Sequence, residues 1–204
     1  MLASVCTTLF SLYTNAHLAE KYWKQVKRAY SSKSRYYHNL AHLQHIYECL
    51  LPIKTKIEDW DVVLFTLFYH DYIYNPLRKN NELKSAQFAK KVLEHTSLPA
   101  ERIKRSYLQI LGTKTHEFSI DNDANYFNDA DLAILGSEPA VYKTYLENIR
   151  KEYRMYPTFV YNKGRHKVVA HFLAMDKIYK TAHFQEMFED GARSNLEAEL
   201  TSLI

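Results

Sequence analysis

The chain has 204 residues, of which 47% are hydrophobic and 14% aromatic, and its formal net charge is +4. This length lies in the single-domain range and can bury a substantial core, so we expect one domain over residues 1–204. With only four glycines and five prolines, the composition disfavours turn-rich all-β folds and favours a mainly helical protein. The mild positive charge suits an anionic small molecule and gives no reason to expect nucleic acid as a partner.

The cysteines and the first residues argue against an exported, disulfide-bonded or membrane-anchored protein. Cys6 and Cys49 form no CxxC motif and belong to no larger cysteine set. The start at Met1–Cys6 lacks a basic n-region, and its apolar run is too short to cross a bilayer. We therefore expect a cytoplasmic protein with no membrane partner, and a homo-oligomer stays open.

Apolar residues recur at helical spacing along most of the chain. A first helical segment is expected to extend to about Tyr30, and Asn39 is a plausible N-cap for a helix over residues 40–50. Gly164 is expected to interrupt the pattern, and residues 114–122 are expected to be irregular. The other expected helices are Ile57 to about Tyr72, Asn81 to about His95, Ala100 to Leu111 closed by Gly112, Tyr126 to Leu135, a helix capped by Ser137 that ends near Tyr153, Val168 to Tyr179, and Phe184 to about Leu203, weakened at Gly191.

An adjacent His70-Asp71 pair lies in the apolar aromatic run Phe68–Tyr72. A carboxylate near a protein core is normally paired or metal-bound, because burying it alone is costly. The pair alone has little weight, since chance predicts about 0.4 His-Asp pairs in a chain of this composition.

Other metal-binding residue types occur before and after this pair. His42 shares a helix face with either His38 or His45, although each histidine has an ordinary explanation in solvent or core, and His45 is the weakest candidate. Downstream, Asp129 and Asp131 precede an apolar helix, where carboxylates also favour the helix dipole; this explanation suits Asp129 better. A set of imidazoles and carboxylates without thiolate suits a divalent Mn, Fe, Ni, Co or Mg ion.

In this order, His42, His70-Asp71 and Asp131 resemble the HD superfamily of metal-dependent phosphohydrolases. The surrounding sequence resembles a bacterial subgroup of predicted HD phosphohydrolases over nearly the whole chain. The resemblance implies an all-α, phosphodiesterase-like HD-domain helical bundle with a metal between central helices. The similar segments are Tyr37–His42, Tyr69–Tyr74, Asn81–Ala86, Asp129–Leu132, Asn148–Tyr153 and Gly164-Arg165.

The resemblance also implies roles for single residues. The expected metal ligands are His42, His70, Asp71 and Asp131, with Asp129 in reserve and Asp71 also taking part in catalysis. His38 would then face the site as a contact to a ligand residue or to substrate and as a catalytic candidate for moving a proton, and the choice between His38 and His42 as first ligand stays open. His116 lies where two-metal relatives place an extra ligand, and an exposed loop histidine is an equally good explanation.

One departure concerns proton transfer. Some relatives carry an acidic residue three or four positions after the doublet, where this chain has Tyr74 and Asn75. Glu82 is the natural substitute as general acid or base, although a glutamate in the first turn of a helix can simply favour the dipole. The candidates for holding a phosphate or other substrate group, each of which taken singly is more often a surface residue, are Arg35, Lys114, His116, Arg150 and Arg165.

These residues favour hydrolysis of a phosphoester by metal-activated water, with a nucleotide or related small molecule as the expected substrate. No glycine-rich phosphate loop occurs, which disfavours an NTP-driven kinase or ATPase. The alternative is an HD-type ligand-binding or regulatory module with little or no turnover, and the missing acidic residue after the doublet is its main support.

Overall fold

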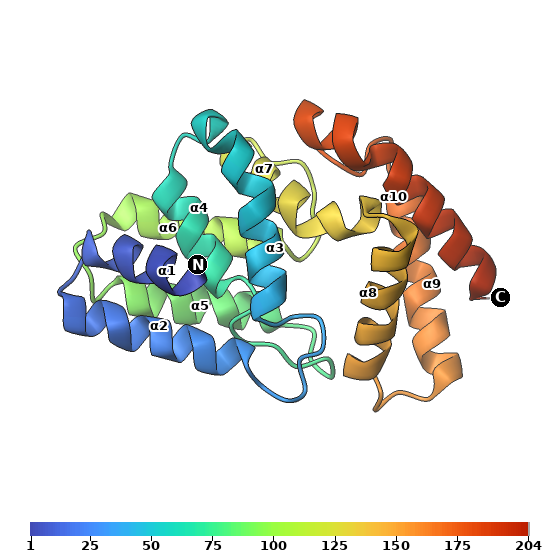
Figure 1. The fold of residues 1–204 in the computed structure, drawn as a ribbon, viewed down its shortest axis with the longest axis horizontal. Coiled ribbons are helices and arrows are strands. Elements are labelled where there is room, and N and C mark those ends of the chain that lie inside the picture. The colour runs from blue at the N-terminus through green and yellow to red at the C-terminus, as the bar shows by residue number, and fades with distance from the viewer. Residues whose placement is uncertain (204) are drawn as a thin grey trace. The chain divides into compact units, whose positions relative to one another are not determined.

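The computed structural model describes residues 1–203, whose regular secondary structure consists of ten α-helices and two 3₁₀ helices (Figure 1). The expected all-α class is therefore confirmed. Within these residues, no helix combines the length and the apolar character that crossing a membrane requires. The chain divides into two compact units, Met1–Phe127 and Asn128–Ile204, and each is described by itself.

The helices of the first unit are α1 (Leu2–Ser11), α2 (Ala16–Tyr30), α3 (Leu40–Leu50), η1 (Leu51–Lys56), α4 (Trp60–Tyr69), α5 (Asn81–Leu93), α6 (Ala100–Gly112) and the start of α7 (Asn122–Leu132). The second unit contains the rest of α7, then η2 (Ala133–Gly136), α8 (Pro139–Glu152), α9 (Thr158–Ala174) and α10 (Ala182–Ser202).

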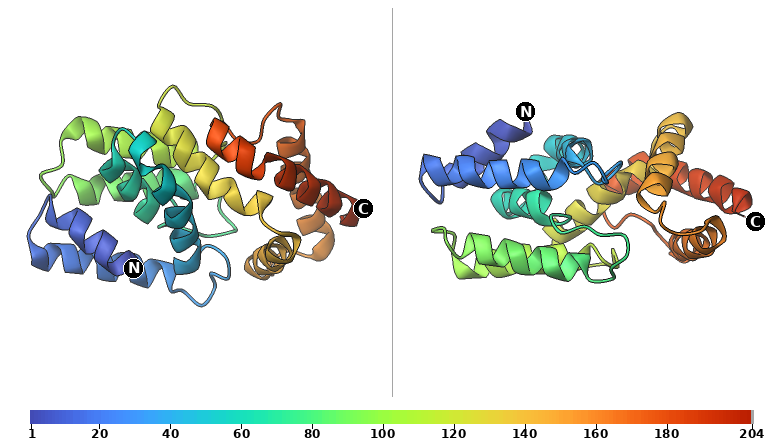
Figure 2. Two further views of the ribbon diagram at one scale, coloured as in Figure 1. Left: turned by 45° about the horizontal axis from the view of Figure 1, so that its top comes forward. Right: turned by 90° about the horizontal axis from the view of Figure 1, so that it is seen from below.

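Helix α4 forms the centre of the first unit. Every residue from Val62 to Tyr69 is buried, as expected for a helix that is apolar on all sides. Helices α1 and α2 pack together on one side of α4, and α5 and α6 pack together on the other (Figure 2). Phe10 of α1 contacts Phe65 edge to face, with ring centroids 5.1 Å apart. The His-Asp doublet thus follows directly after a buried helix that its neighbours hold in place.

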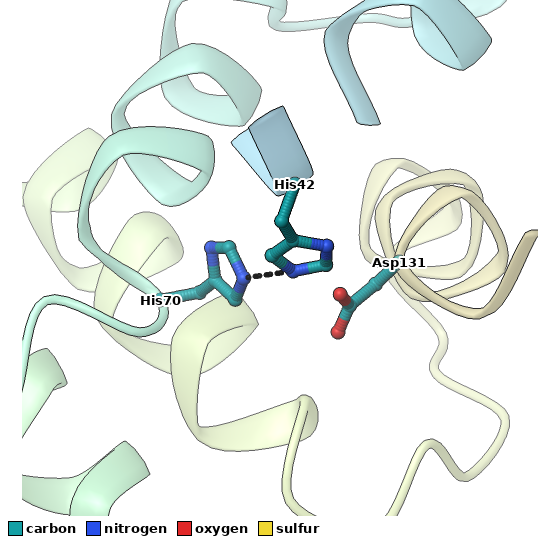
Figure 3. Close-up of side chains that lie close together, drawn as sticks. All are labelled: His42, His70 and Asp131. Carbon is teal, nitrogen blue, oxygen red and sulfur yellow. Dashed lines mark hydrogen bonds between the residues drawn. The ribbon is translucent and has the colours of Figure 1, made fainter. Parts of the chain in front are cut away.

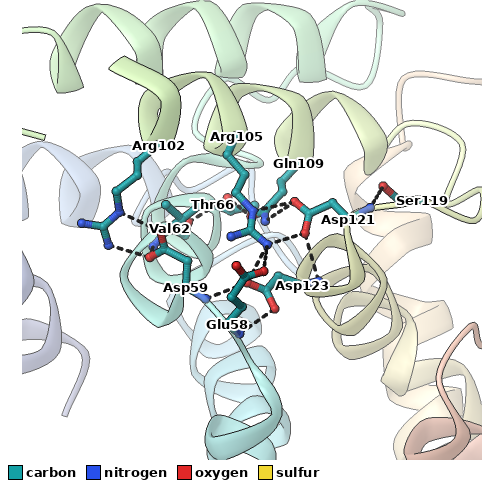
Figure 4. A network of polar contacts seen from close by, with 10 residues as sticks. All are labelled: Glu58, Asp59, Val62, Thr66, Arg102, Arg105, Gln109, Ser119, Asp121 and Asp123. Atoms are coloured by element: carbon teal, nitrogen blue, oxygen red, sulfur yellow. Dashed lines mark hydrogen bonds and ion pairs between the residues drawn. The ribbon is translucent and has the colours of Figure 1, made fainter. Parts of the chain in front are cut away.

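The N-terminal end of α4 is held by charged side chains (Figure 4). Asp59 is the N-cap, and its carboxylate accepts a hydrogen bond from Val62 N at 3.1 Å. Arg102 of α6 contacts both oxygens of the same carboxylate, with Nε–Oδ2 at 2.7 Å and Nη2–Oδ1 at 2.5 Å. A bidentate pair of this kind fixes direction as well as distance, so α6 sets the position of this helix end.

Asp123, in the first turn of α7, joins the same end of α4. Its carboxylate accepts hydrogen bonds from the backbone N–H groups of Glu58 at 2.9 Å and Asp59 at 2.8 Å. Arg105 lies 3.1 Å from Asp123 Oδ2 and forms two further bonds to the carboxylate of Asp121, at 2.7 and 3.0 Å. The start of α7 is therefore tied to the first unit by ion pairs.

In the second unit, η2 and α10 cross at two glycines. A Cβ atom on Gly191 would lie 2.8 Å from Gly136 O, and one on Gly136 would collide with the backbone of Phe188. The backbones approach this closely only because neither residue has a side chain. The sequence pattern marks Gly191 as a weak point of its helix, whereas here it is a packing position.

Several expected boundaries differ from the structure. The first segment is two helices, because Asn15 caps a new helix by accepting from Leu18 N at 2.9 Å. The break expected at Gly164 and the helix expected over Val168 to Tyr179 are wrong, since α9 continues through Gly164 and ends at Ala174. Nothing lies within 4 Å of a Cβ built on Gly164, so this glycine costs helix propensity without breaking the helix.

Two expected helix ends also differ. Ser137 does not cap α8: its hydroxyl donates to Ile134 O at 2.8 Å, and Glu138 is the N-cap residue. Helix α6 ends at Gly112, but that glycine does not take the left-handed conformation. His116 takes it instead, with φ 51°, and its N–H donates to Gly112 O at 3.0 Å.

Candidate metal centre

His70 is the C-cap of α4 and is 1% exposed. Its Nδ1 lies 3.0 Å from the carbonyl oxygen of Leu67. A carbonyl only accepts, so Nδ1 carries the hydrogen, and Nε2 presents its lone pair on the opposite side of the ring. A backbone carbonyl that fixes the tautomer in this way is a recurring feature of metal-binding histidines.

His42 lies in the first turn of α3, which begins where the sequence predicts because Asn39 accepts from Ala41 N at 2.8 Å. The side chain is buried, and its Nε2 lies 3.3 Å from His70 Nε2 (Figure 3). Nitrogen ligands lie about 2.0–2.1 Å from an ion such as zinc, so neighbouring ligands of one ion are about 3 Å apart. The two nitrogens are thus spaced like ligands of a single ion.

Asp71 follows His70 outside the helix, and its side chain is 17% exposed. The Oδ2 atom lies 3.3 Å from His70 Nε2, 3.9 Å from His42 Nε2 and 3.9 Å from His38 Nε2. His38 lies in the loop before α3, where its ring stacks on Tyr74 with centroids 4.3 Å apart. One carboxylate oxygen is therefore surrounded by three imidazole nitrogens, and both His38 and His42 reach it.

The acidic candidates on α7 have different surroundings. Asp131 is half-buried in the part of α7 that belongs to the second unit. Asp129 is fully buried and accepts from Lys180 N at 2.8 Å and from the N–H and hydroxyl of Thr181, both at 2.7 Å. Burial raises the pKa of Asp129, and these hydrogen bonds oppose the shift. Asp129 is thus committed to the start of α10, which leaves Asp131 as the ligand candidate.

The donor set fits a divalent cation. His70 turns a lone pair towards the Nε2 of a second buried histidine, and a carboxylate oxygen lies within 4 Å of both nitrogens. Two such nitrogens facing each other are stable when they share a proton or a cation. Mixed nitrogen and oxygen ligands without thiolate suit Mn, Fe, Ni, Co or Mg.

Glu82 lies half-buried in the first turn of α5, and within residues 1–203 its carboxylate forms no hydrogen bond or ion pair. Its neighbours on the helix anchor the loop after the doublet. Asn81 accepts from Asn75 N at 3.1 Å and donates to Asn75 O at 2.9 Å, while Ser85 bonds both backbone groups of Ile73. The anchoring roles of Asn81 and Ser85 were not predicted, although both residues belong to a segment that the family resemblance marks.

Two of the arginines expected to hold a phosphate are engaged within the second unit. Arg165 is paired with both oxygens of buried Glu199, at 2.6 and 2.9 Å, and it also donates to Tyr145 OH at 3.2 Å. Arg150 donates to the carbonyls of Tyr153 at 3.0 Å and Tyr156 at 3.1 Å, which closes the turn after α8. Both guanidinium groups therefore have structural roles.

The remaining candidates differ from one another. Arg35 donates to the carbonyls of Asp71 at 2.8 Å and Tyr72 at 2.9 Å. Lys114 is exposed in the turn after α6, and His116 is half-buried two residues later in the left-handed conformation. Of these residues, Lys114 is the exposed one.

No family model, curated protein or solved structure matches this chain.

Proposed function

We propose that the protein is a metal-dependent phosphohydrolase of the HD type. The observation that carries the proposal is the placement of the Asp71 carboxylate against His42 Nε2 and His70 Nε2, which are themselves 3.3 Å apart. The sequence order of these residues resembles the HD superfamily, and the resemblance supplies the substrate class, a phosphoester such as a nucleotide.

A bound divalent ion would lower the pKa of a coordinated water and offset negative charge on phosphoryl oxygens. His42, His70 and Asp71 would hold it, and the family resemblance implies Asp131 as a further ligand. His38 is the imidazole suited to contact substrate, because its side chain is 20% exposed while its Nε2 still faces Asp71. Glu82 is the second candidate for moving a proton, on a helix start that is tied to the loop after the doublet.

Metal content tests the site directly. Purified wild type should carry or take up one of Mn, Fe, Ni, Co or Mg, and Asp71→Ala should lose it while keeping its helical circular dichroism. Asp190→Ala, which removes an exposed carboxylate from α10, is the matched control and should keep the metal. An unchanged metal content in Asp71→Ala would remove the basis of the proposal.

Turnover is tested separately, with a panel of nucleotides and generic phosphoesters under each of the five metals. Hydrolysis that is lost in both His70→Ala and Asp71→Ala is the expected result. Asn75 occupies a position at which some relatives carry an acidic residue. It cannot take over proton transfer, because it is an amide whose Oδ1 already accepts from Leu77 N at 2.9 Å. A protein that binds metal and hydrolyses none of the panel would instead be a ligand-binding or regulatory module.

A further inference from the structure

Asp71 lies beyond the end of α4, so the hydrogen bonds of the helix do not fix its backbone. Helix α4 ends at Tyr69, and the last carbonyls of any helix need partners from elsewhere. The backbone N–H and carbonyl of Asp71 are bonded by residues at the end of α2 and in the loop that follows. Its N–H donates to Tyr30 OH at 3.2 Å, and its carbonyl accepts from Arg35 Nη1 at 2.8 Å.

The Arg35 guanidinium also joins this backbone to the histidine segment. The same Nη1 donates to His38 O at 3.1 Å, and Nη2 donates to Tyr72 O at 2.9 Å. The guanidinium lies over the ring of Tyr30 at 4.7 Å and the ring of Tyr74 at 5.4 Å, which restricts its orientation. One side chain therefore connects the backbone of His38 with the backbone of Asp71.

The Asp71 carboxylate faces the imidazoles while Arg35 holds the backbone of the same residue. An arginine beside an aspartate commonly forms a bidentate pair with the carboxylate, which would compete with a cation. Here the bonds of Arg35 to this residue run to its carbonyl, while Asp71 Oδ2 faces His38, His42 and His70. The positive charge also lies at the C-terminal end of α4, where it is favoured by the helix dipole.

We propose that Arg35 is a positioning residue of the metal centre. By holding the carbonyls of His38 and Asp71 on one nitrogen, it sets the separation between the His38 ring and the Asp71 carboxylate. The inference rests on the proposed metal site and adds a residue that contacts neither metal nor substrate. Outer residues that orient metal ligands typically change metal affinity about 10–100-fold when they are replaced.

The test is a Co²⁺ titration followed by visible absorbance, which reports both affinity and ligand geometry. Arg35→Gln should bind Co²⁺ about 10–100-fold more weakly than wild type, with an altered absorption spectrum at saturation. Arg35→Lys should also lose affinity, because one ammonium group does not reproduce the planar fork that spans these carbonyls.

Arg193→Gln is the matched control. Arg193 donates to the carbonyls of Met175 at 2.9 Å and Asp176 at 2.8 Å after α9, and it also forms an ion pair with Glu189 at 2.8 Å. Its loss therefore removes carbonyl contacts of the same kind, together with an ion pair, from the second unit. It should leave Co²⁺ affinity and spectrum unchanged even where its melting temperature falls as much as that of Arg35→Gln. Affinity loss in Arg35→Gln alone therefore separates positioning from general destabilisation.

Wild-type affinity and spectrum in Arg35→Gln or Arg35→Lys would overturn the inference and leave the metal site standing. Failure of wild type to bind Co²⁺ or any of the other metals would overturn the proposed function, and the inference with it. If Arg35→Gln does not fold, Tyr30→Phe removes only the hydroxyl that receives Asp71 N–H, and its Co²⁺ spectrum should still shift. An unshifted spectrum in both Tyr30→Phe and Arg35→Lys would overturn the inference equally.

Discussion

The two ends of α4 use arginine in opposite ways. At the N-terminal end, Arg102 and Arg105 contact the carboxylates of Asp59, Asp121 and Asp123. At the C-terminal end, Arg35 contacts backbone carbonyls, and the carboxylate of Asp71 faces three histidines.

The pKa values at the N-terminal end reflect this pairing. Burial alone would raise the pKa of Asp59, but hydrogen bonds from Arg102 and the Val62 N–H hold it below its ordinary value. Burial acts on Asp121 in the same way, and Arg105 and Gln109 lower its pKa. Carboxylates that are already neutralised by guanidinium groups have little to offer a cation. The difference separates structural charge at one end of the helix from a candidate cation site at the other.

The largest expected effect is on stability, from Asp123→Ala. This change removes the acceptor of two backbone N–H groups and a partner of Arg105 from a residue that is 1% exposed. Leaving two backbone N–H groups without their acceptor should cost about 2–4 kcal/mol, so the urea midpoint should fall strongly. The exposed Asp190→Ala should change the free energy of unfolding by less than about 0.5 kcal/mol. A loss below about 1 kcal/mol in Asp123→Ala would contradict the structural role of this end.

A bound metal ion should stabilise the protein at the C-terminal end of α4. At a free concentration of 100 times Kd, an ion that binds only the folded state raises the free energy of unfolding by about 2.7 kcal/mol. Wild type should show this increase in thermal or urea unfolding, and Asp71→Ala should not. Arg102→Gln should retain the increase, because its guanidinium acts at the opposite end. An equal gain in Asp71→Ala would place the ion elsewhere.

The loss of stability at low pH should depend on the ion pairs at the N-terminal end of α4. Since the folded-state pKa of Asp59 is lowered, its pairing stabilises the protein above its unfolded-state pKa of about 4 and is lost as pH falls through the folded value. The difference in unfolding free energy between wild type and Arg102→Gln should therefore be full near neutral pH and shrink below about pH 4. A difference that stays constant down to pH 2 would show that Arg102 does not act through an ionised carboxylate.

The smallest effect is expected midway along α4, at Thr66. Its hydroxyl is fully buried and has two acceptors within reach, Gln109 Oε1 at 2.8 Å and Val62 O at 3.0 Å. Thr66→Val leaves Gln109 Oε1 without this donor, so we expect a loss of about 1 kcal/mol in urea unfolding and unchanged metal affinity. Thr144→Val removes a similar bond, to Ala140 O at 3.1 Å, from an exposed position of α8 and should cost less.

The sequence predicted the helices whose ends carry a local signal. Helix α3 begins after Asn39 as expected, because the asparagine side chain accepts from a free N–H group at the helix start. Helix α5 also begins at Asn81 as expected, but its N-cap Asn80 forms no side-chain cap bond. Gly164 misled the prediction, since one glycine costs a helix only about 1 kcal/mol and neighbouring residues outweigh that cost. The break between α1 and α2 was missed, although Asn15 is a recognisable cap.

For the site, the sequence predicted residues better than their surroundings. It brought forward His42, His70 and Asp71, which the structure gathers, because their order along the chain resembles that of the HD superfamily. It could not assign roles to the arginines, because the sequence alone does not distinguish a guanidinium that binds carbonyls from one that binds phosphate. Arg150 shows this clearly: its carbonyl partners lie three and six residues onward, and only the turn after α8 brings them within reach.

The glycine crossing in the second unit has a consequence for sequence variation. Any side chain at Gly136 or Gly191 must push η2 away from α10, whereas a side chain at Gly164 meets open space. Among sequences that keep this fold, positions 136 and 191 should therefore remain glycine unless the facing helix changes as well. Position 164 should vary freely, and alanine there should stabilise α9.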